Sequence, residues 1–277
     1  MMSPVFNEAS AKVIARLKTN LPQALLLEGM EGVGLGTAAS TIAGKYIAGY
    51  CLPTAPDGSV DESPKGVIRV AQIRELAEQV RTVAAKKAVI IIDNADRMNT
   101  QAQNAFLKLL EEPNSTTHFI LTSHHAQLLL PTILSRVQRI TIRPILEHDS
   151  LRLIKKLGIK DARAQQQLLF LASGRPAEIA RLASNPSSLE ASAKLVSDAR
   201  TLLQGKPYER TIIAFAYASD KAVALKLLET ALMLVRFSLH KHATKELVQR
   251  SASLLSAYEA IASNGNVRLQ LMQFVLQ

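Results

Sequence analysis

Residues 24–37 read Ala-Leu-Leu-Leu-Glu-Gly-Met-Glu-Gly-Val-Gly-Leu-Gly-Thr, and this stretch decides the fold. The apolar residues 24–27 predict a short strand, the glycines predict a turn, and the residues after Gly34 predict the start of a helix. Gly29 and Gly34 occupy the two glycine positions of the phosphate-binding template G-x-x-x-x-G-K-[ST], with Gly32 between them. Glycines allow backbone N–H groups to face a phosphate, and a helix N-terminus adds positive potential.

The two positions that carry the chemistry of this template hold the wrong residues. Leu35 stands where a lysine would reach the β- and γ-phosphates, and Gly36 stands where a hydroxyl would hold Mg²⁺, while Thr37 comes one residue late. A dinucleotide-binding G-x-G-x-x-G pattern fits less well, because its third glycine would fall at Thr37. We interpret the stretch as a nucleotide loop that has lost its chemistry; a plain tight turn is the alternative.

A second stretch, residues 89–96, is a buried strand ending in acids, Val-Ile-Ile-Ile-Asp-Asn-Ala-Asp. In ATPases with a phosphate loop, a carboxylate at the place of Asp93 binds Mg²⁺. The next residue is normally a glutamate that activates the attacking water, and here it is Asn94, whose amide cannot act as a general base. Asp93 alone could also be a simple cap after a strand. Together the two stretches predict an ATPase fold that does not hydrolyse ATP by itself. Nucleotide binding by this fold is doubtful, and we expect that it requires no cofactor.

The rest of the first 145 residues alternates between strand-like and helix-like segments. A loop rich in proline and glycine covers residues 52–66. Strands that alternate with helices predict an α/β domain with a parallel, doubly wound sheet. The predicted strands are 24–27, 88–92, 117–122 and 139–142, and the predicted helices are 8–19, 38–50, 70–84 and 100–110.

After Pro144 the strand signals stop and only helical patterns follow. The dipeptide Asn185-Pro186 interrupts them. We therefore predict three domains: an α/β domain over 1–145, a small helical lid over 146–186 and an all-helical domain over 187–277. The predicted helices of the last two domains are 149–157, 161–172, 176–182, 189–203, 208–217, 221–240, 245–262 and 267–276.

Composition excludes several classes of protein. The 277 residues include 33 Lys+Arg and 23 Asp+Glu, one cysteine, no tryptophan and a hydrophobic fraction of 48%, which excludes wholesale disorder. One cysteine cannot form an internal disulfide, the N-terminus shows no secretory pattern and no apolar run reaches membrane-spanning length, so we expect a cytoplasmic protein without a membrane partner. The net charge of +10 suggests a polyanion nearby, although it also fits a solvated basic surface.

Two further stretches carry a specific resemblance. Residues 99–113 read NTQAQNAFLKLLEEP and residues 129–136 read LLPTILSR. Both resemble the clamp-loader branch of the AAA+ ATPases, and the similarity extends over most of residues 1–185 and, more faintly, over the helical tail. Damaged nucleotide motifs beside an intact Ser135-Arg136 are similar to the non-hydrolysing stator subunit of that branch.

The resemblance implies a function in DNA replication. The chain would be a rigid subunit of a pentameric clamp loader, which loads the sliding clamp onto primed DNA at the cost of ATP. Its partners would be the ATPase motor subunits and a delta-type subunit, with the helical tail packed in a collar ring. Arg136, in the Ser135-Arg136 motif, would be an arginine finger that reaches the γ-phosphate of ATP on a neighbouring subunit. Taken alone, Arg136 fits a surface arginine at a helix end better, and it is the surrounding motif that favours the finger.

Other candidate sites are weaker. Relatives with this resemblance often carry a four-cysteine zinc module, but Cys51 stands alone, so we expect no metal. Arg175 lies where the resemblance would place a sensor arginine, although Pro176 favours a simple helix start. We expect the adjacent His124 and His125 to be exposed loop residues.

Two other functions stay open from the sequence. One is a self-sufficient AAA+ ATPase, such as the motor subunit of the same complex. The other is a DNA-binding scaffold without an ATPase partner, which the positive charge would suit.

Overall fold

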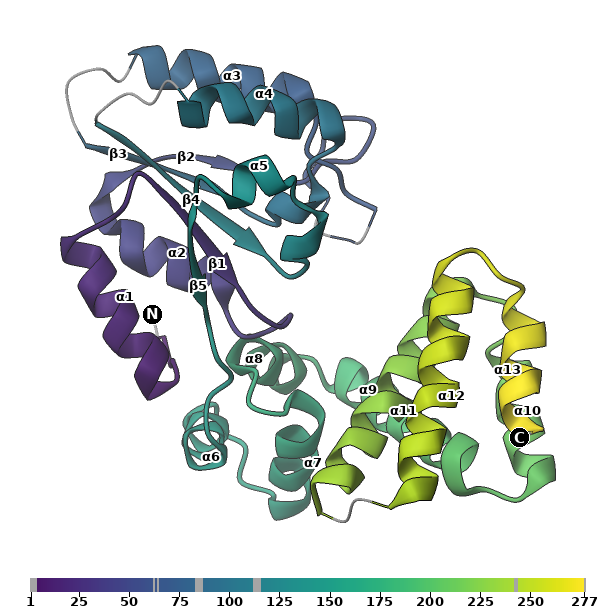
Figure 1. The fold of residues 1–277 in the computed structure, drawn as a ribbon. Helices are drawn as coiled ribbons and strands as arrows, with labels where there is room; N and C mark the ends of the chain where they lie inside the picture. Colours follow the sequence, from purple (N-terminus) through teal and green to yellow (C-terminus); the bar gives the residue numbers. More distant parts are fainter. Residues whose placement is uncertain are drawn as a thin grey trace. The chain divides into compact units, whose positions relative to one another are not determined.

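A five-stranded parallel sheet organises the first part of the chain (Figure 1). The structure is a computed structural model, and it describes residues 4–61, 63, 65–82, 87–111, 116–241 and 244–276. The strand order is β2-β3-β4-β1-β5, and every pairing is parallel. The strands are β1 (Ala24–Glu28), β2 (Ile47–Cys51), β3 (Ala88–Ile92), β4 (Thr117–Ser123) and β5 (Gln138–Thr141).

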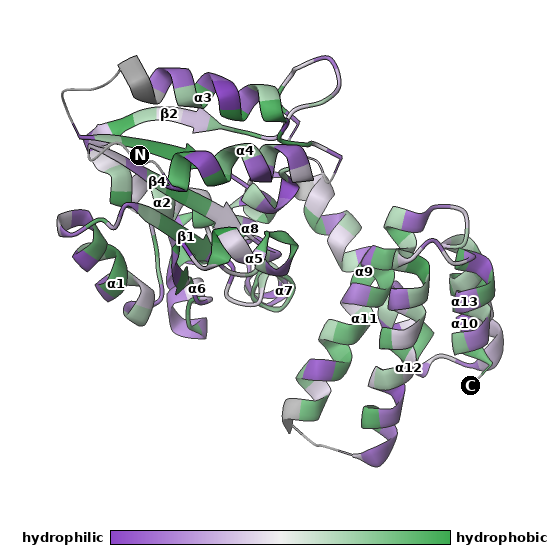
Figure 2. Cartoon of the chain, turned by 45° about the horizontal axis from the view of Figure 1, so that its top comes forward, coloured by the Kyte–Doolittle hydropathy of each residue, from purple (hydrophilic) through white to green (hydrophobic). Residues whose placement is uncertain are grey.

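The three central strands, β3, β4 and β1, are buried on both faces, and their middle residues are apolar (Figure 2), while β4 carries polar residues at both ends. Successive side chains of a strand point to opposite faces. In β1, Leu25 and Leu27 therefore belong to one apolar cluster and Leu26 to another, while in β3 Ile91 and Ile92 divide in the same way. The sheet thus separates two hydrophobic cores.

Each core is completed by two helices whose apolar residues recur at helical spacing and face the sheet. Helices α1 (Glu8–Thr19) and α2 (Leu35–Ala43) bury residues such as Ile14 and Ile42 against one face of the sheet. Helices α3 (Val70–Thr82) and α4 (Thr100–Glu111) cover the other face with residues such as Ile73 and Phe106. Figure 1 shows the two helix pairs on opposite sides of the sheet. The predicted α/β fold with a parallel, doubly wound sheet is confirmed.

The predicted helix over residues 38–50 is wrong in its second half. Helix α2 ends at Gly44, whose φ of 55° lies in the left-handed region that glycine adopts easily. A short 3₁₀ turn, Gly44–Tyr46, then leads into β2, which pairs with β3 along the edge of the sheet. The apolar residues of this segment fit the spacing of a helix and also that of a strand, and only the pairing with β3 shows that the segment is a strand. Residues 83–84 of the predicted helix 70–84 lie outside the described residues.

Three helices follow the sheet and belong to the same compact unit. They are α6 (Glu147–Lys156), α7 (Ala162–Ala172) and α8 (Pro176–Ser184), and they pack on one another through Ile154, Leu168 and Ile179. The chain divides into Met1–Ser184, here unit 1, and Asn185–Gln277, here unit 2. The boundary falls at the Asn185-Pro186 dipeptide. The finer boundary near residue 145 stays a prediction.

Unit 2 is entirely helical over its described residues. Its helices are α9 (Pro186–Gln204), α10 (Pro207–Ala216), α11 (Lys221–Lys241), α12 (Lys245–Ala262) and α13 (Val267–Val275). The long helix α11 packs on both α9 and α12, with Leu227 and Leu228 fully buried. Among the helices of the described residues, none has the length and hydropathy that crossing a membrane requires.

Candidate functional site

The glycine-rich loop joins β1 to α2, as predicted, and its glycines are required by its backbone. Gly34 precedes α2 with a φ of 90°, and Gly32 has a φ of 83°, both in the left-handed region. Gly29 faces a neighbouring strand so closely that a Cβ atom there would lie 2.8 Å from the Ile142 carbonyl oxygen. The turn itself therefore needs these glycines, whatever its ligand.

The position of the phosphate-binding lysine faces the core. Leu35 is 3% exposed and belongs to the hydrophobic cluster that β1 shares with α1 and α2. Val33 is 1% exposed, and the side chains of Val33 and Leu35 lie 3.1 Å and 3.4 Å from the Cβ position of Gly29. Two apolar side chains therefore pack against the start of the loop, and Leu35 contributes to stability.

Helix α8 lies against the tip of the loop. The Ala177 backbone N–H donates to the Gly32 carbonyl oxygen over 2.9 Å, and a Cβ atom on Gly32 would lie 3.0 Å from the Cβ of Glu178. Arg181 donates two hydrogen bonds of 2.7 Å to Glu178. This contact raises the pKa of Arg181, and the charge of Glu31 in the loop raises it further. The loop is thus held by the chain's own helix.

The acidic strand end lies beside the loop, as the motif pairing predicts. A Cβ atom on Gly36 would lie 3.6 Å from Asp93 Oδ1, so the two altered motifs meet in space. The Thr122 hydroxyl donates to Asp93 Oδ1 over 2.6 Å, and the Asn94 amide donates to Asp93 Oδ2 over 3.3 Å. Both carboxylate oxygens of Asp93 therefore accept a hydrogen bond from the chain itself.

Asn94 has a backbone conformation that suits its side chain. Its φ of 51° and ψ of 53° are left-handed, which asparagine tolerates better than most residues. Its backbone N–H donates to the Thr122 hydroxyl over 2.9 Å. Thr122 thus connects both residues, and the sequence analysis missed it. Its place at the end of β4, next to β3, is the signal that could have found it.

His124 does not match the expectation of an exposed loop residue. It is half-buried, and its Nδ1 lies 2.9 Å from the Gly29 carbonyl oxygen, while its backbone N–H donates to Asp96 Oδ1 over 3.3 Å. His125 is exposed, as expected. His124 therefore joins the end of β4 to the start of the glycine loop.

Arg175 binds the end of helix α7. Its Nε donates to the Ala172 carbonyl and its Nη2 donates to the Leu171 carbonyl, each over 2.8 Å. These are carbonyl groups at the C-terminus of α7, which have no partner inside the helix. The guanidinium of Arg175 thus caps α7.

Ser135 and Arg136 follow the short helix α5 (Pro131–Leu134). The Ser135 hydroxyl donates to the Thr132 carbonyl over 3.0 Å. Arg136 is exposed, with Nη1 3.0 Å from the Thr132 carbonyl and Nη2 3.1 Å from Glu111 Oε1 at the end of α4. Glu112 and Pro113, the end of the quoted motif, lie outside the described residues. The partners of Arg136 come from α4 and α5 and not from the glycine loop.

Cys51 ends β2 inside the core. It is 3% exposed, and burial raises the pKa of its thiol to about 12. Within the described part of the chain, no group of three His, Cys, Asp or Glu side chains is placed to hold a metal ion. The apolar surroundings of Cys51 make it a packing residue.

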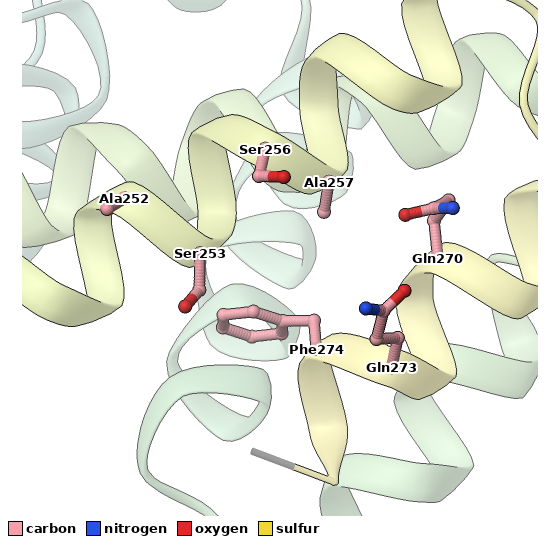
Figure 3. Close-up of a pocket in the computed structure, with 7 residues that line it drawn as sticks. All are labelled: Ala252, Ser253, Ser256, Ala257, Gln270, Gln273 and Phe274. Atoms are coloured by element: carbon pink, nitrogen blue, oxygen red, sulfur yellow. The ribbon is translucent and has the colours of Figure 1, made fainter.

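A cavity of about 250 Å³ lies in unit 2 between α12 and α13 (Figure 3). Its walls carry hydroxyl, amide and apolar side chains and no titratable group: Ala252, Ser253, Ser256, Ala257, Gln270, Gln273 and Phe274. Such a lining offers no acid, base or nucleophilic thiolate for catalysis.

Comparison with known families now adds to this geometry. A family model described as "DNA polymerase III, delta subunit" matches residues 7–146, which include the glycine loop, Asp93 and Arg136. The chain belongs to this family. The resemblance predicted from residues 99–113 and 129–136 is thereby confirmed.

Two bacterial proteins illustrate the similarity. DNA polymerase III subunit delta' of Pseudomonas aeruginosa is 34% identical over 180 residues, which are 57% of this chain and 55% of that protein. The corresponding protein of Bacillus subtilis is 28% identical over 247 residues, which are 78% and 70% of the two chains. The match thus spans little more than half of the first relative. A replication factor C subunit 3, from Blastobotrys adeninivorans, is 29% identical over 156 residues, 54% of this chain and 46% of that one.

Solved structures show the same fold. A DNA polymerase III gamma-subunit-related protein of Thermotoga maritima aligns with a TM-score of 0.53 at 16% identity, over 96% of this chain and 97% of that one. The branch-migration motor RuvB of the same organism aligns with a TM-score of 0.50 at 16% identity, over 83% and 76%. These likenesses support the predicted AAA+ architecture with its helical C-terminal region.

Proposed function

We propose that this chain is the non-hydrolysing stator of a DNA polymerase III clamp loader. In this role it supports the ATP-dependent loading of the sliding clamp onto primed DNA without turning over ATP itself. The observation that carries the proposal is the burial of Leu35 at the position of the phosphate-binding lysine. A leucine side chain packed in the core neither reaches nor neutralises a phosphate.

Four further features support the absence of hydrolysis. Gly36 offers no hydroxyl for Mg²⁺, and Asn94 offers no carboxylate to activate water. Asp93 accepts hydrogen bonds from Thr122 and Asn94. Helix α8 also lies against Gly32 at the tip of the loop. We therefore propose that the loop retains no nucleotide and that the chain requires no cofactor or zinc.

Arg136 is the residue that we propose to act on ATP. Its side chain lies next to a short helix and is 39% exposed, and a guanidinium presents a planar fork of N–H donors that matches a phosphate. These properties suit an arginine finger that enters the ATP site of a neighbouring motor subunit, with Ser135 shaping the turn. In related systems such a finger contributes about 10³–10⁵ in rate.

The partners follow from the same proposal. They are the motor subunits and the delta-type subunit of the loader, and through the complex also the sliding clamp and primed DNA. The names of the Pseudomonas and Bacillus relatives support the assignment to DNA polymerase III. The net charge of +10 suits a subunit that approaches DNA phosphates. Unit 2 would form part of the collar.

A phosphate-release assay on the purified chain tests the proposal. We expect no ATP turnover above buffer and no saturable binding of a fluorescent ATP analogue, with an active motor subunit as positive control. Turnover that disappears on Asp93→Asn would show that the chain is itself an ATPase and would overturn the proposal.

A further inference from the structure

The carboxylate of Glu111 lies at a place where helix energetics alone would not put it. Glu111 is the last residue of α4, and an acid at a helix C-terminus meets the negative end of the helix dipole. Lys108, in the same last turn, has the favourable sign. The position of Glu111 is therefore explained by what its side chain contacts, and that contact is Arg136.

Glu111 approaches Arg136 across 25 residues of sequence. Its Oε1 is 3.1 Å from Arg136 Nη2, while Nη1 donates to the Thr132 carbonyl over 3.0 Å. The two acceptors come from different helices, α4 and α5, which pack on each other. A planar group held at both terminal nitrogens has a fixed orientation as well as a fixed position.

The contacts leave the guanidinium able to bind a second anion. Arginine has five N–H donors in a rigid plane, and the contacts to Glu111, Thr132 and, at 3.5 Å, the Ser135 hydroxyl engage at most three of them among the described residues. The side chain is 39% exposed, so solvent reaches it. An arginine that acts on a phosphate must lose the rotamer freedom of a long side chain, and prior anchoring reduces that loss.

We infer that Glu111 is a positioning residue for Arg136, which it holds in the orientation that meets a phosphate on a neighbouring subunit. This inference rests on the proposed function, because it assigns Arg136 its role in trans. Glu111 itself touches no substrate and acts through the ion pair. Its loss therefore lowers the rate of the chemical step and leaves the affinity for ATP unchanged.

A double-mutant cycle in the reconstituted clamp loader tests this inference. The variants are Glu111→Ala, Glu111→Gln, Arg136→Ala and the double variant Glu111→Ala/Arg136→Ala, all in the full-length chain. Glu8→Ala is the matched control, since Glu8 also forms an ion pair on a helix, 2.7 Å from Lys12, away from Arg136. DNA-stimulated ATP turnover gives kcat and KM for each complex.

We expect Glu111→Ala to lower kcat at the affected site by about three- to fivefold, the size of one partly exposed charged contact, with KM for ATP unchanged. Glu111→Gln keeps an acceptor oxygen and retains more than half of the activity, and Glu8→Ala has no effect. In the Arg136→Ala background, Glu111→Ala adds nothing.

Two results would overturn the inference and leave the finger in place: an unchanged kcat in Glu111→Ala, or an equal further loss when Glu111→Ala is added to Arg136→Ala. The second result would show that Glu111 acts on folding or assembly. If Arg136→Ala alone leaves turnover unchanged, the proposed function itself fails, and the inference fails with it.

Discussion

Truncation of Leu35 tests whether this residue, which occupies the position of the phosphate-binding lysine in the loop template, is part of the hydrophobic core. Leu35 is 3% exposed and packs in the cluster between β1, α1 and α2. Leu→Ala at a buried site costs about 2–5 kcal/mol, through lost burial and a cavity, and we take about 3 kcal/mol for Leu35→Ala. For a unit of this size, 1 kcal/mol lowers Tm by about 2–4 °C. The expected shift for unit 1 is therefore about 6–12 °C.

Differential scanning calorimetry measures this shift, because the chain has no tryptophan and divides into two compact units, for which we expect separate transitions. Met30→Ala is the control: Met30 lies in the same loop but is 52% exposed, so its truncation costs less than about 0.5 kcal/mol. The transition of unit 2 stays in place. A shift below about 2 °C for Leu35→Ala would refute the reasoning, since a side chain that faced an open phosphate site would be removed at little cost.

Three other predictions concern the same part of the chain. Leu35→Lys combined with Gly36→Thr restores the loop motif but gives no ATP turnover in a phosphate-release assay, because Asn94 still provides no base; turnover in this variant would contradict the account of hydrolysis. Thr122→Val removes the 2.6 Å hydrogen bond to Asp93 and lowers the free energy of unfolding by about 1.5–3 kcal/mol in urea titrations, whereas a change below about 0.5 kcal/mol would show that the bond carries no weight. Burial raises the pKa of Cys51 to about 12, so the native thiol reacts with a thiol reagent at pH 8 far more slowly than the thiol of the chain unfolded in urea, and equal labelling rates in the two states would contradict the burial. Because the pKa of this thiol is higher in the folded chain than in the unfolded chain, its contribution to stability is complete below about pH 8.5 and is lost as the pH rises towards 12.

The elements with an unambiguous period were predicted well from the sequence. The apolar, β-branched residues 88–92 form β3, and the helical spacing of residues 8–19 forms α1 with the same bounds. Both signals are local, because a strand buried on both faces and a helix with one apolar stripe can each be recognised from the pattern of neighbouring residues alone. The edge strand β2 was missed because its residues also fit a helix, which was the predicted structure. Its strand conformation comes from the pairing with β3, which the sequence of the segment does not show.

The contacts of the candidate site residues could not be predicted from the sequence, and their functional roles stay predictions. The sequence identified Leu35, Gly36 and Asn94 as chemically altered positions by comparison with a motif. It could not show that Leu35 packs into the core or that α8 lies against Gly32, because those contacts depend on tertiary structure. For the same reason it missed His124, whose ring lies next to the Gly29 carbonyl although 95 residues separate the two in sequence.

The central claim is that the chain acts on ATP in trans through Arg136, and the most direct measurement compares two arginine variants in the reconstituted clamp loader. Arg136 and Arg139 are both partly exposed, at 39% and 47%, and each pairs with a glutamate. Arg136→Ala is expected to lower turnover at the adjoining ATP site strongly and to slow clamp loading, while the complex still assembles. Arg139→Ala is expected to behave as wild type. Equal turnover in the two variant complexes would contradict the account.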